Sequence, residues 1–388
     1  MSIERDVLII GGGPAGLSTA LHVARDFPAL ASRILILEKA RYPRFKLCAG
    51  GLVLDAEVIL QRLGLDASEV PHVDVDSIHF DFHAKGLKVK VPQKHALRVI
   101  RRDEFDHWLM EKARDQGIAI REGVTVKNII PDQGGVTVET DLEIFRAMVV
   151  VGADGSNGVT RRCIFPNAPV YTARVLEIIT PPYPYASPKF REEAREGVAF
   201  FDFFPVPNNI AGYVWDFPTQ VKGEAMRCWG IYDTNILASE KRPQLKEPLA
   251  KEMKRLGFNL DDYEIKGHPI RWFSPTNQLS VPRIILVGDA AGADPLFGEG
   301  ISIALGYGAV AAREIGEAFR TNDFSMNNFK RRVTRSALGR TLFARWFIAQ
   351  VIYSLKWKWF QILLWWIMKP IVGLAGWQFV LNWGKRLR

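Results

Sequence analysis

The chain has 388 residues, 48% hydrophobic and 24% charged, a composition typical of a globular protein large enough for two domains. Its three cysteines argue against a disulfide framework and favour a reducing compartment. The first apolar stretch is flanked by acids (Glu4, Asp6 and Asp26), so we expect no signal peptide.

The net charge of +9 comes from the end of the chain. The last acidic residue is Asp323, and twelve basic residues follow it, whereas the preceding chain carries 39 basic and 42 acidic residues. The basic charge therefore indicates the kind of partner that this last segment binds. It gives no reason to expect that the preceding chain binds nucleic acid.

The first forty residues predict a strand, a glycine-rich turn, a helix and a second strand. Residues 5–10 (RDVLII) are a strand-like apolar run, and Gly11, Gly13 and Gly16 follow it where helical apolar spacing begins. The second run, 33–37, ends at Glu38, whose carboxylate can accept hydrogen bonds from ribose hydroxyls. This arrangement predicts dinucleotide binding at the helix N-terminus. The alternative is a glycine-rich turn that binds nothing.

Short strands and helices alternate over the next hundred residues. The glycines of Cys48-Ala49-Gly50-Gly51 suggest backbone passing close to a ligand, and a helix is expected from about Leu54. Residues 77–91 predict a hairpin with its turn at Lys85-Gly86. Further expected elements are a strand at 97–100, a helix at 102–116, paired strands at 123–130 and 135–140, and a buried parallel strand at 148–152.

The middle of the chain, from about Tyr171 to Trp272, is rich in aromatic residues. After a proline-rich loop at 181–188 we expect strands at 197–204, 211–217 and 225–232, then a mostly helical segment from 233 to 256. Tyr213, Trp215 and Phe217 are two residues apart and would share one face of a strand. An ordinary sheet core would show the same pattern.

A last strand–loop–helix unit follows. Residues 283–287 (RIILV) predict a parallel strand ending at Gly288-Asp289, and a helix is expected to run from Gly300-Ile301 to about Phe319. The N-terminus of this helix would offer its dipole to an anion or a polarised carbonyl.

Four motifs in this order resemble the FAD signatures of flavoproteins of the p-hydroxybenzoate hydroxylase type. They are GGGPAG (11–16), Arg102-x-x-Phe105-Asp106, GADGSNG (152–158) and the GDAAG–DPLFGEGI stretch (288–301). The resemblance covers roughly residues 1–320 and implies an FAD cofactor. It also implies an α/β + β fold, in which a Rossmann-like FAD-binding domain is interleaved with an antiparallel-sheet substrate domain and followed by a helical C-terminal tail.

These expectations divide the chain into three parts. The FAD-binding domain would comprise residues 1–75, 97–165 and 275–325, and the substrate-binding domain would comprise 76–96 and 166–274. The tail would be residues 326–388.

Two further motifs narrow the resemblance to the geranylgeranyl reductase family. Cys48-Ala49-Gly50-Gly51 resembles its cysteine–glycine motif, and residues 213–218 (YVWDFP) match its YxWxFP substrate-cavity motif. The family reduces isolated double bonds of geranylgeranyl chains with reduced FAD. Such a reaction needs a hydride from the flavin and a proton from the reduced flavin, a water or a side chain.

The expected cofactor contacts begin at the nucleotide end. The residues expected to hold the pyrophosphate are Gly11, Gly13, Ala15 and Gly16. Glu38 would bind the adenosine ribose, Arg102 would contact phosphate or ribityl oxygens, and Val126 would offer its backbone to the adenine.

At the flavin end, Asp289 would bind the ribityl hydroxyls. The backbone N–H groups of Gly300 and Ile301 would stabilise the negative charge of the reduced ring. By resemblance Asp154 supports the FAD, although a strand-ending turn is an equally simple interpretation. Cys48, Ala49 and Gly51 would pass beside the ring.

Three residues are candidates for catalysis, and no metal is expected. Cys48 is a candidate proton donor because the resemblance places it near the ring; a small buried thiol filling a tight loop is the alternative. Tyr213 and Trp215 would wall an apolar tunnel that excludes water and holds the prenyl chain, although Trp215 could be plain core.

The source of electrons is left open by the sequence. There is no second strand–GxGxxG–helix unit, since Gly306-x-Gly308 falls inside an expected helix. The donor would be a transiently docking nicotinamide such as NADPH, a ferredoxin-like protein or a quinol.

The tail combines tryptophan with basic residues. Residues 340–388 hold seven of the eleven tryptophans, and the charge-free runs 359–368 and 370–383 are shorter than the roughly 18 apolar residues of a spanning helix. This pattern predicts monotopic attachment to the cytoplasmic face of a membrane. The alternatives are a buried helical pair that caps the substrate domain, or an oligomer interface.

Three functions are compatible with these observations. The leading hypothesis is an FAD-dependent reductase of prenyl chains. The second is a flavin monooxygenase or halogenase of the same fold, which Trp215 and Pro218 leave open. The third is a membrane-bound flavin electron-transfer module, which would need no aromatic tunnel.

Overall fold

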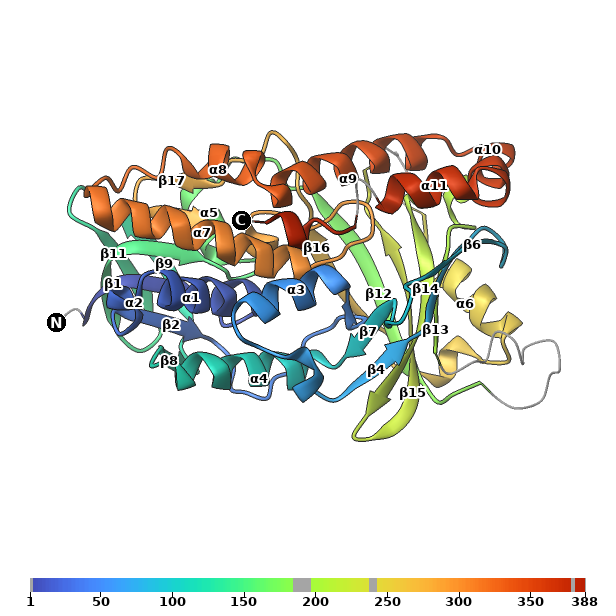
Figure 1. The fold of residues 1–388 in the computed structure, drawn as a ribbon, viewed down its shortest axis with the longest axis horizontal. Coiled ribbons are helices and arrows are strands. Elements are labelled where there is room, and N and C mark those ends of the chain that lie inside the picture. Colours follow the sequence, from blue (N-terminus) through green and yellow to red (C-terminus); the bar gives the residue numbers. More distant parts are fainter. Residues whose placement is uncertain (1–2, 184–196, 237–242, 378–380, 388) are drawn as a thin grey trace.

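Two large sheets, a small sheet and a set of covering helices make up the fold (Figure 1). The computed structural model describes residues 3–183, 197–236, 243–377 and 381–387. The fold class expected from the sequence is confirmed.

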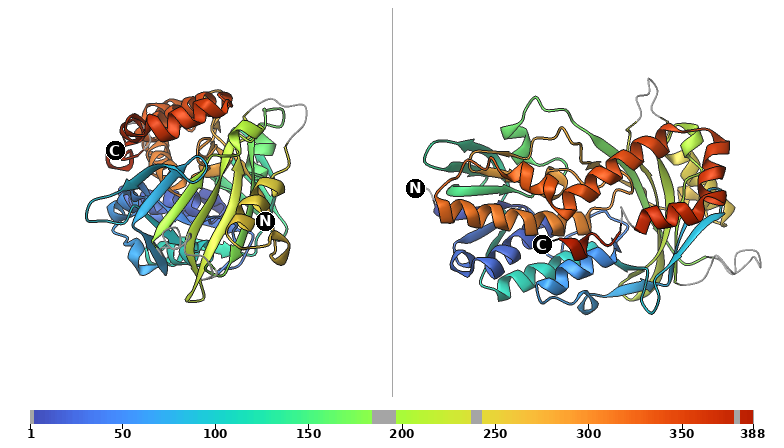
Figure 2. Two further views of the ribbon diagram at one scale, coloured as in Figure 1. Left: turned by 90° about the vertical axis from the view of Figure 1, so that its right-hand side faces the viewer. Right: turned by 45° about the horizontal axis from the view of Figure 1, so that its top comes forward.

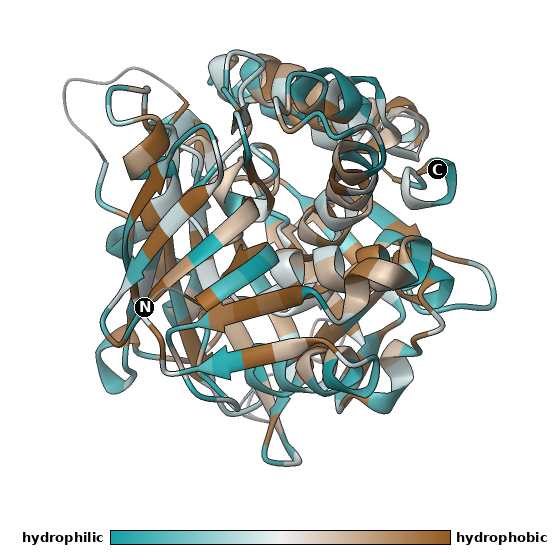
Figure 3. Ribbon diagram, turned by 90° about the vertical axis from the view of Figure 1, so that its left-hand side faces the viewer, coloured by the Kyte–Doolittle hydropathy of each residue, from teal (hydrophilic) through white to brown (hydrophobic). Residues whose placement is uncertain are grey.

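The first sheet carries the glycine turn and contains eight strands. They are β1 (Ile3–Ile10), β2 (Ile34–Glu38), β8 (Ala119–Glu122), β9 (Val126–Pro131), β10 (Val136–Thr140), β11 (Ile144–Gly152), β17 (Ser280–Val281) and β18 (Ile284–Leu286). Strands β18, β11, β1, β2 and β8 run parallel in that order, and the β9–β10 hairpin adds to β11. Figure 3 shows the hydrophobic residues of this end of the molecule concentrated along the strands.

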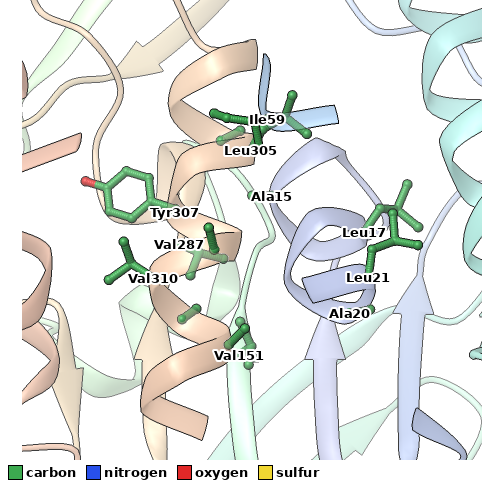
Figure 4. Packing of buried hydrophobic residues seen from close by; sticks show 14 of the residues in the cluster. Ala15, Leu17, Ala20, Leu21, Ile59, Val151, Val287, Leu305, Tyr307 and Val310 are labelled. Carbon is green, nitrogen blue, oxygen red and sulfur yellow. The ribbon is translucent and has the colours of Figure 1, made fainter. Parts of the chain in front are cut away.

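Helices cover the parallel strands, as buried parallel sheets require. The helices of this part are α1 (Pro14–Asp26), α2 (Pro28–Ala31), α3 (Leu54–Arg62), α4 (Arg102–Asp115), α5 (Val159–Ile164) and α7 (Ile301–Thr321). Helices α1 and α7 lie side by side, where Ser18 Oγ donates to the carbonyl of Leu305 (2.8 Å). Leu17 and Leu21 of α1 and Val310 of α7 belong to one buried core (Figure 4).

The second sheet contains seven strands and stands at the opposite end of the molecule (Figure 1). In order they are β16 (Lys266–Arg271), β12 (Thr172–Thr180), β15 (Glu224–Asp233), β14 (Gly212–Val221), β13 (Val198–Asp202), β5 (Ser77–Asp81) and β6 (Gly86–Lys90). Neighbours are antiparallel except β13 and β5, which are parallel. Helix α6 (Lys246–Arg255) packs against this sheet through Leu249 and Met253.

Short elements connect these layers. The small sheet has the order β3 (Gly51–Leu52), β7 (Leu97–Ile100), β4 (His72–Val75). Single 3₁₀ turns are η1 (Ala67–Glu69), η3 (Val206–Asn208), η4 (Leu260–Asp262) and η5 (Gly288–Ala290).

One expectation about the middle of the chain is wrong. Residues 218–221, expected in a loop, continue β14, because they pair with β15 as far as Val221 with Glu224. Within the segment 233–256, Asp233 still belongs to β15, and the described helix is α6. Asp233 accepts hydrogen bonds from the backbone of Ala211 and Asn235, which fixes an extended end. Most of the proline-rich loop and residues 237–242 lie outside the described residues.

The tail forms a helical chain along one side of both sheets (Figure 2). Its elements are α8 (Phe329–Arg335), α9 (Ala337–Ser354), α10 (Lys358–Ile362), the π-helical turn η6 (Leu363–Ile367), α11 (Lys369–Ala375) and η8 (Gly384–Arg386). Trp366 Nε1 donates to the carbonyl of Phe82 (2.9 Å), so the tail contacts the β5–β6 turn. Among the described residues, none of the helices is long and apolar enough to cross a bilayer.

Candidate active site

A cavity of about 960 Å³ lies between the two large sheets. At one end it is lined by the glycine turn and Glu38, and at the other by aromatic side chains of the second sheet. Cavities of this size between domains are where proteins commonly hold cofactors and small substrates.

The glycine turn has the geometry of a nucleotide-binding turn. Gly11 has a φ of +106°, and a Cβ there would lie 2.4 Å from the carbonyl oxygen of Ala153, so only glycine fits. Glu38 at the end of β2 accepts hydrogen bonds from the N–H groups of Gly12 (2.8 Å) and Ala40 (2.9 Å). The carboxylate thus ties the turn to the next loop, and it also lines the cavity. Gly13, Ala15 and Val126 line the same end.

Arg102 places a positive charge in the cavity wall. Its Nε and Nη2 donate to the two carboxylate oxygens of Asp106 at 2.7 and 2.9 Å, and Arg44 Nη2 lies 3.1 Å from the same carboxylate. Burial lowers the pKa of Arg102, but Asp106 and the Cys48 thiol raise it more, so the side chain stays protonated.

Asp289 and the start of α7 lie close together in another part of the cavity wall. Asp289 accepts a hydrogen bond from Ser156 Oγ (3.2 Å), and a Cβ on Gly300 would lie 3.7 Å from its other oxygen. Gly300 immediately precedes α7, so the positive end of the helix dipole lies at this part of the cavity, where the N–H of Ser302 already donates to Glu299 Oε1 (2.7 Å). Ile301 lines it as well.

Asp154 follows β11 in the structure. Its Oδ2 accepts from the backbone N–H (2.8 Å) and hydroxyl (2.9 Å) of Thr160, which holds the first turn of α5. The side chain therefore stabilises the turn after the strand, and it also lines the cavity.

The aromatic end of the cavity contains the three predicted catalytic residues. Tyr213 and Trp215 of β14 and the half-buried Cys48 all line it. The Tyr213 hydroxyl donates to the carbonyl of Phe297, and the ring of Phe201 lies 5.0 Å from that of Tyr213. Packing and hydrogen bonding hold these rings in place, so the aromatic end of the cavity is an apolar chamber of defined shape.

Two groups at this site were missed from the sequence. Lys46 Nζ lies 2.7 Å from His268 Nε2, and burial lowers the pKa of both side chains. Glu177 of β12 is buried in the cavity wall. Glu177 could have been found from the sequence, because it is an acid on the buried side of the apolar strand TARVLEIIT. The contact between Lys46 and His268 could not, because the two residues are far apart in the chain.

These residues fit FAD in shape and chemistry. The glycine turn leaves room for a pyrophosphate, Glu38 and Asp289 offer acceptors for hydroxyl groups, and the start of α7 favours a reduced, negatively charged ring. The fold and the site together define an FAD-dependent oxidoreductase.

The chain belongs to the family described as "FAD binding domain", whose sequence model matches residues 4–320. An uncharacterized protein of Methanosarcina barkeri is 30% identical over 354 residues, covering 90% of this chain and 84% of that protein. Digeranylgeranylglycerophospholipid reductase 2 of Methanopyrus kandleri is 28% identical over 350 residues, covering 85% of this chain and 81% of that protein.

Solved structures share the fold. A geranylgeranyl bacteriochlorophyll reductase-like protein of Thermoplasma acidophilum superposes with a TM-score of 0.79 at 22% identity, covering 99% of this chain and 98% of that one. Halogenase PltM superposes with a TM-score of 0.71 at 18% identity, covering 96% and 80%, and has been crystallised with FAD. The comparisons confirm the predicted resemblance and the FAD cofactor.

Proposed function

We propose that this protein saturates the double bonds of prenyl chains by hydride transfer from reduced FAD together with a proton. The observation that carries the proposal is the continuity of the cavity, since one space of about 960 Å³ is lined by the residues expected to bind FAD, except Gly16, and by Cys48, Tyr213 and Trp215. An apolar chamber that opens onto a flavin suits a substrate with isolated double bonds and no polar groups near them. The reductase of Methanopyrus kandleri adds support through its name.

The roles of the chain's own residues follow from the geometry. Bound FAD supplies the hydride. The N–H groups at the start of α7 stabilise negative charge on the ring. Tyr213, Trp215 and Phe201 bury the prenyl chain, exclude water and hold a double bond against the ring. We propose that electrons reach the flavin from a docking nicotinamide, a ferredoxin-like protein or a quinol.

The test uses purified protein with bound FAD, photoreduced without oxygen and mixed with geranylgeranyl lipids. We expect reoxidation of the flavin spectrum and a gain of two mass units for each reduced double bond. If none of the diphosphate, phospholipid or chlorophyll-type prenyl substrates reoxidises the flavin, the proposal fails. Rapid electron exchange with a quinone but no change in the prenyl chain would support the electron-transfer alternative.

The halogenase alternative has one specific observation in its favour. Lys46 lines the same cavity as Trp215, and a lysine is the side chain that relays hypohalous acid in halogenases. Adding oxygen and halide with an aromatic acceptor tests this function, because a halogenase consumes oxygen in step with a halogenated product. A reductase gives its product without oxygen.

We further propose that the tail rests on the cytoplasmic face of a membrane. Of the fourteen large hydrophobic side chains exposed among the described residues, nine lie between Phe343 and Trp377. Lys358 and Lys369 are exposed in the same segment, as attachment to anionic headgroups requires. Because Trp377 and Leu381 also line the cavity, a prenyl lipid would enter it without passing through bulk water.

A further inference from the structure

Glu177 occupies an unusual place in the wall of the substrate chamber. On one side of β12 it is paired directly with Lys266 of β16, and on the other with Gly230 of β15, which in turn is paired with Trp215. Residues directly opposite one another in an antiparallel sheet point to the same face. Glu177 and Trp215 therefore point to the cavity from neighbouring positions, with only the hydrogen of Gly230 between them.

The absence of a side chain at position 230 brings the two groups together. A Cβ on Gly230 would lie 2.1 Å from Trp215 Cζ2, so the indole ring covers this glycine and extends toward β12. The chamber thus contains one buried carboxyl group beside the predicted catalytic tryptophan.

One oxygen of the carboxyl group is left without a hydrogen bond. Glu177 is 4% exposed, and the backbone of Cys48 hydrogen-bonds to its carboxyl group, but Oε2 is buried without a hydrogen-bond partner among the described residues. It takes part in none of the ion pairs found within the described residues. A buried acid of this kind costs free energy unless it is protonated or serves a function.

The charged and titratable groups around it come from four elements. They are Lys266 on β16, Cys228 on β15, Lys46 and Cys48 in the loop before β3, and Arg101 before α4. Burial raises the pKa of Glu177 to about 7, against the lowering effect of Arg101, the Cys48 backbone, Lys266 and Lys46. A carboxyl group that is half-protonated near neutral pH is suited to general acid catalysis.

We propose that Glu177 is the acid that protonates the prenyl double bond. The inference rests on the proposed function. The Glu177 carboxyl would transfer its proton to one alkene carbon, while the adjacent carbon receives the hydride that reduced FAD would supply as it is oxidised. Two C–H bonds form, and the alkene π bond, the flavin N–H bond that gives the hydride and the Glu177 O–H bond break; the carboxylate regains a proton from water after the product leaves.

Besides Cys48, the proton donor expected from the sequence, the chamber holds Tyr213, which is less suited to this step than Glu177. The Tyr213 hydroxyl already donates to the carbonyl of Phe297, and burial raises the pKa of the phenol well above its usual value. A group that holds its proton so tightly is a poor acid near pH 7.

The decisive experiment compares wild type, Glu177→Gln, Glu177→Asp and the control Glu224→Gln. Gln keeps the shape of Glu but carries no transferable proton, and Glu224 lies exposed at the far end of β15. The measured quantity is the rate of anaerobic flavin reoxidation by a prenyl lipid between pH 5 and 9. General acids typically contribute a factor of 10²–10⁴.

We expect the wild-type rate to be highest below pH 7 and to fall above it, because the protonated acid is lost. Glu177→Gln should be slower by about 10²-fold or more and independent of pH in this range. Glu177→Asp should retain part of the rate, and Glu224→Gln should match wild type. Equal rates for Glu177→Gln and wild type would overturn the proposal.

A second readout does not depend on turnover. The infrared absorption of a protonated carboxyl should titrate near pH 7 in the FAD-loaded wild type and be missing from Glu177→Gln, while both bind FAD with equal affinity. A carboxylate that stays ionised down to pH 5 would overturn the assignment. A wild type that no prenyl lipid reoxidises would instead refute the proposed function, and the proton-donor role with it, before any variant is compared.

Discussion

Trp215 is held where it is by the lack of a side chain at position 230. The tryptophan belongs to a motif that can be read from the sequence, but the glycine that accommodates it lies on the neighbouring strand. Besides the ring, a Cβ at position 230 would meet the carbonyl oxygen of Leu176 at 2.3 Å. Neither contact can be relieved without moving the indole or the backbone.

We therefore expect Gly230→Ala to lower the free energy of unfolding by about 1–3 kcal/mol, the usual cost of overpacking. It should also change the tryptophan fluorescence and slow flavin reoxidation by a prenyl lipid. Urea denaturation measures the first effect. The control is Gly376→Ala, where an added Cβ would meet nothing within 4 Å among the described residues beyond its own helix, and equal stability of the two variants would contradict this account.

A buried ion pair joins helix α9 to the loop that precedes α7. Arg345 Nη1 lies 2.9 Å from Asp294 Oδ2 and 3.2 Å from Glu299 Oε2, and its side chain is almost completely buried. Asp294 also accepts from the backbone N–H groups of Leu296 (2.7 Å) and Phe297 (3.2 Å). Burial alone would raise the pKa of Asp294, and Arg345 opposes that rise.

Replacing this arginine leaves the buried Asp294 without its cationic partner, while the half-buried Glu299 keeps its hydrogen bonds from Ser302. We expect Arg345→Met to lower the free energy of unfolding by roughly 3–5 kcal/mol, as when one member of a buried ion pair is removed. FAD affinity should fall too, because Glu299 directly precedes Gly300. Urea unfolding and flavin titration provide the measurements. Arg340→Met, on the exposed side of the same helix, should change stability by less than about 0.5 kcal/mol, and a similar loss there would refute the explanation.

At the scale of the whole molecule, the tail divides its tryptophans between two roles. Trp365 and Trp383 are buried, and Trp365 stacks on Phe203 at 4.3 Å. Trp357 and Trp359 are 59% and 61% exposed. The tail thus covers the molecule on one side and presents an apolar, basic surface on the other, which combines the capping and the membrane interpretations of its sequence.

The exposed tryptophans should decide membrane binding. We expect wild type to sediment with vesicles that contain anionic lipid, less with neutral vesicles and less at high salt. The double variant Trp357→Ser/Trp359→Ser should bind at least about tenfold more weakly, with unchanged flavin content. Leu142→Ser, which removes a 70% exposed side chain from the β10–β11 turn, is the matched control. Equal binding by all three proteins would refute attachment through this surface.

The strands at the glycine turn could be predicted from the sequence better than the strand pairing of the second sheet. β1, α1, β2 and the position of Glu38 were predicted because periodicity and glycine spacing are local properties. The parallel pairing of β13 with β5 was not predicted, since these strands are separated by more than a hundred residues and nothing local specifies the partner. β8 was also missed, because it is only four residues long and none of them is buried.

The sequence by itself determined the FAD-binding family, the cofactor and the aromatic strand with Tyr213 and Trp215, because each depends on residues adjacent in the chain. Only the tertiary structure decided which distant side chains share a cavity. It brings Lys46 to His268, Glu177 to Trp215 across Gly230, and Arg345 to Asp294. The physical reason is that strand register and helix packing, which depend on burying the whole apolar surface at once, set these contacts.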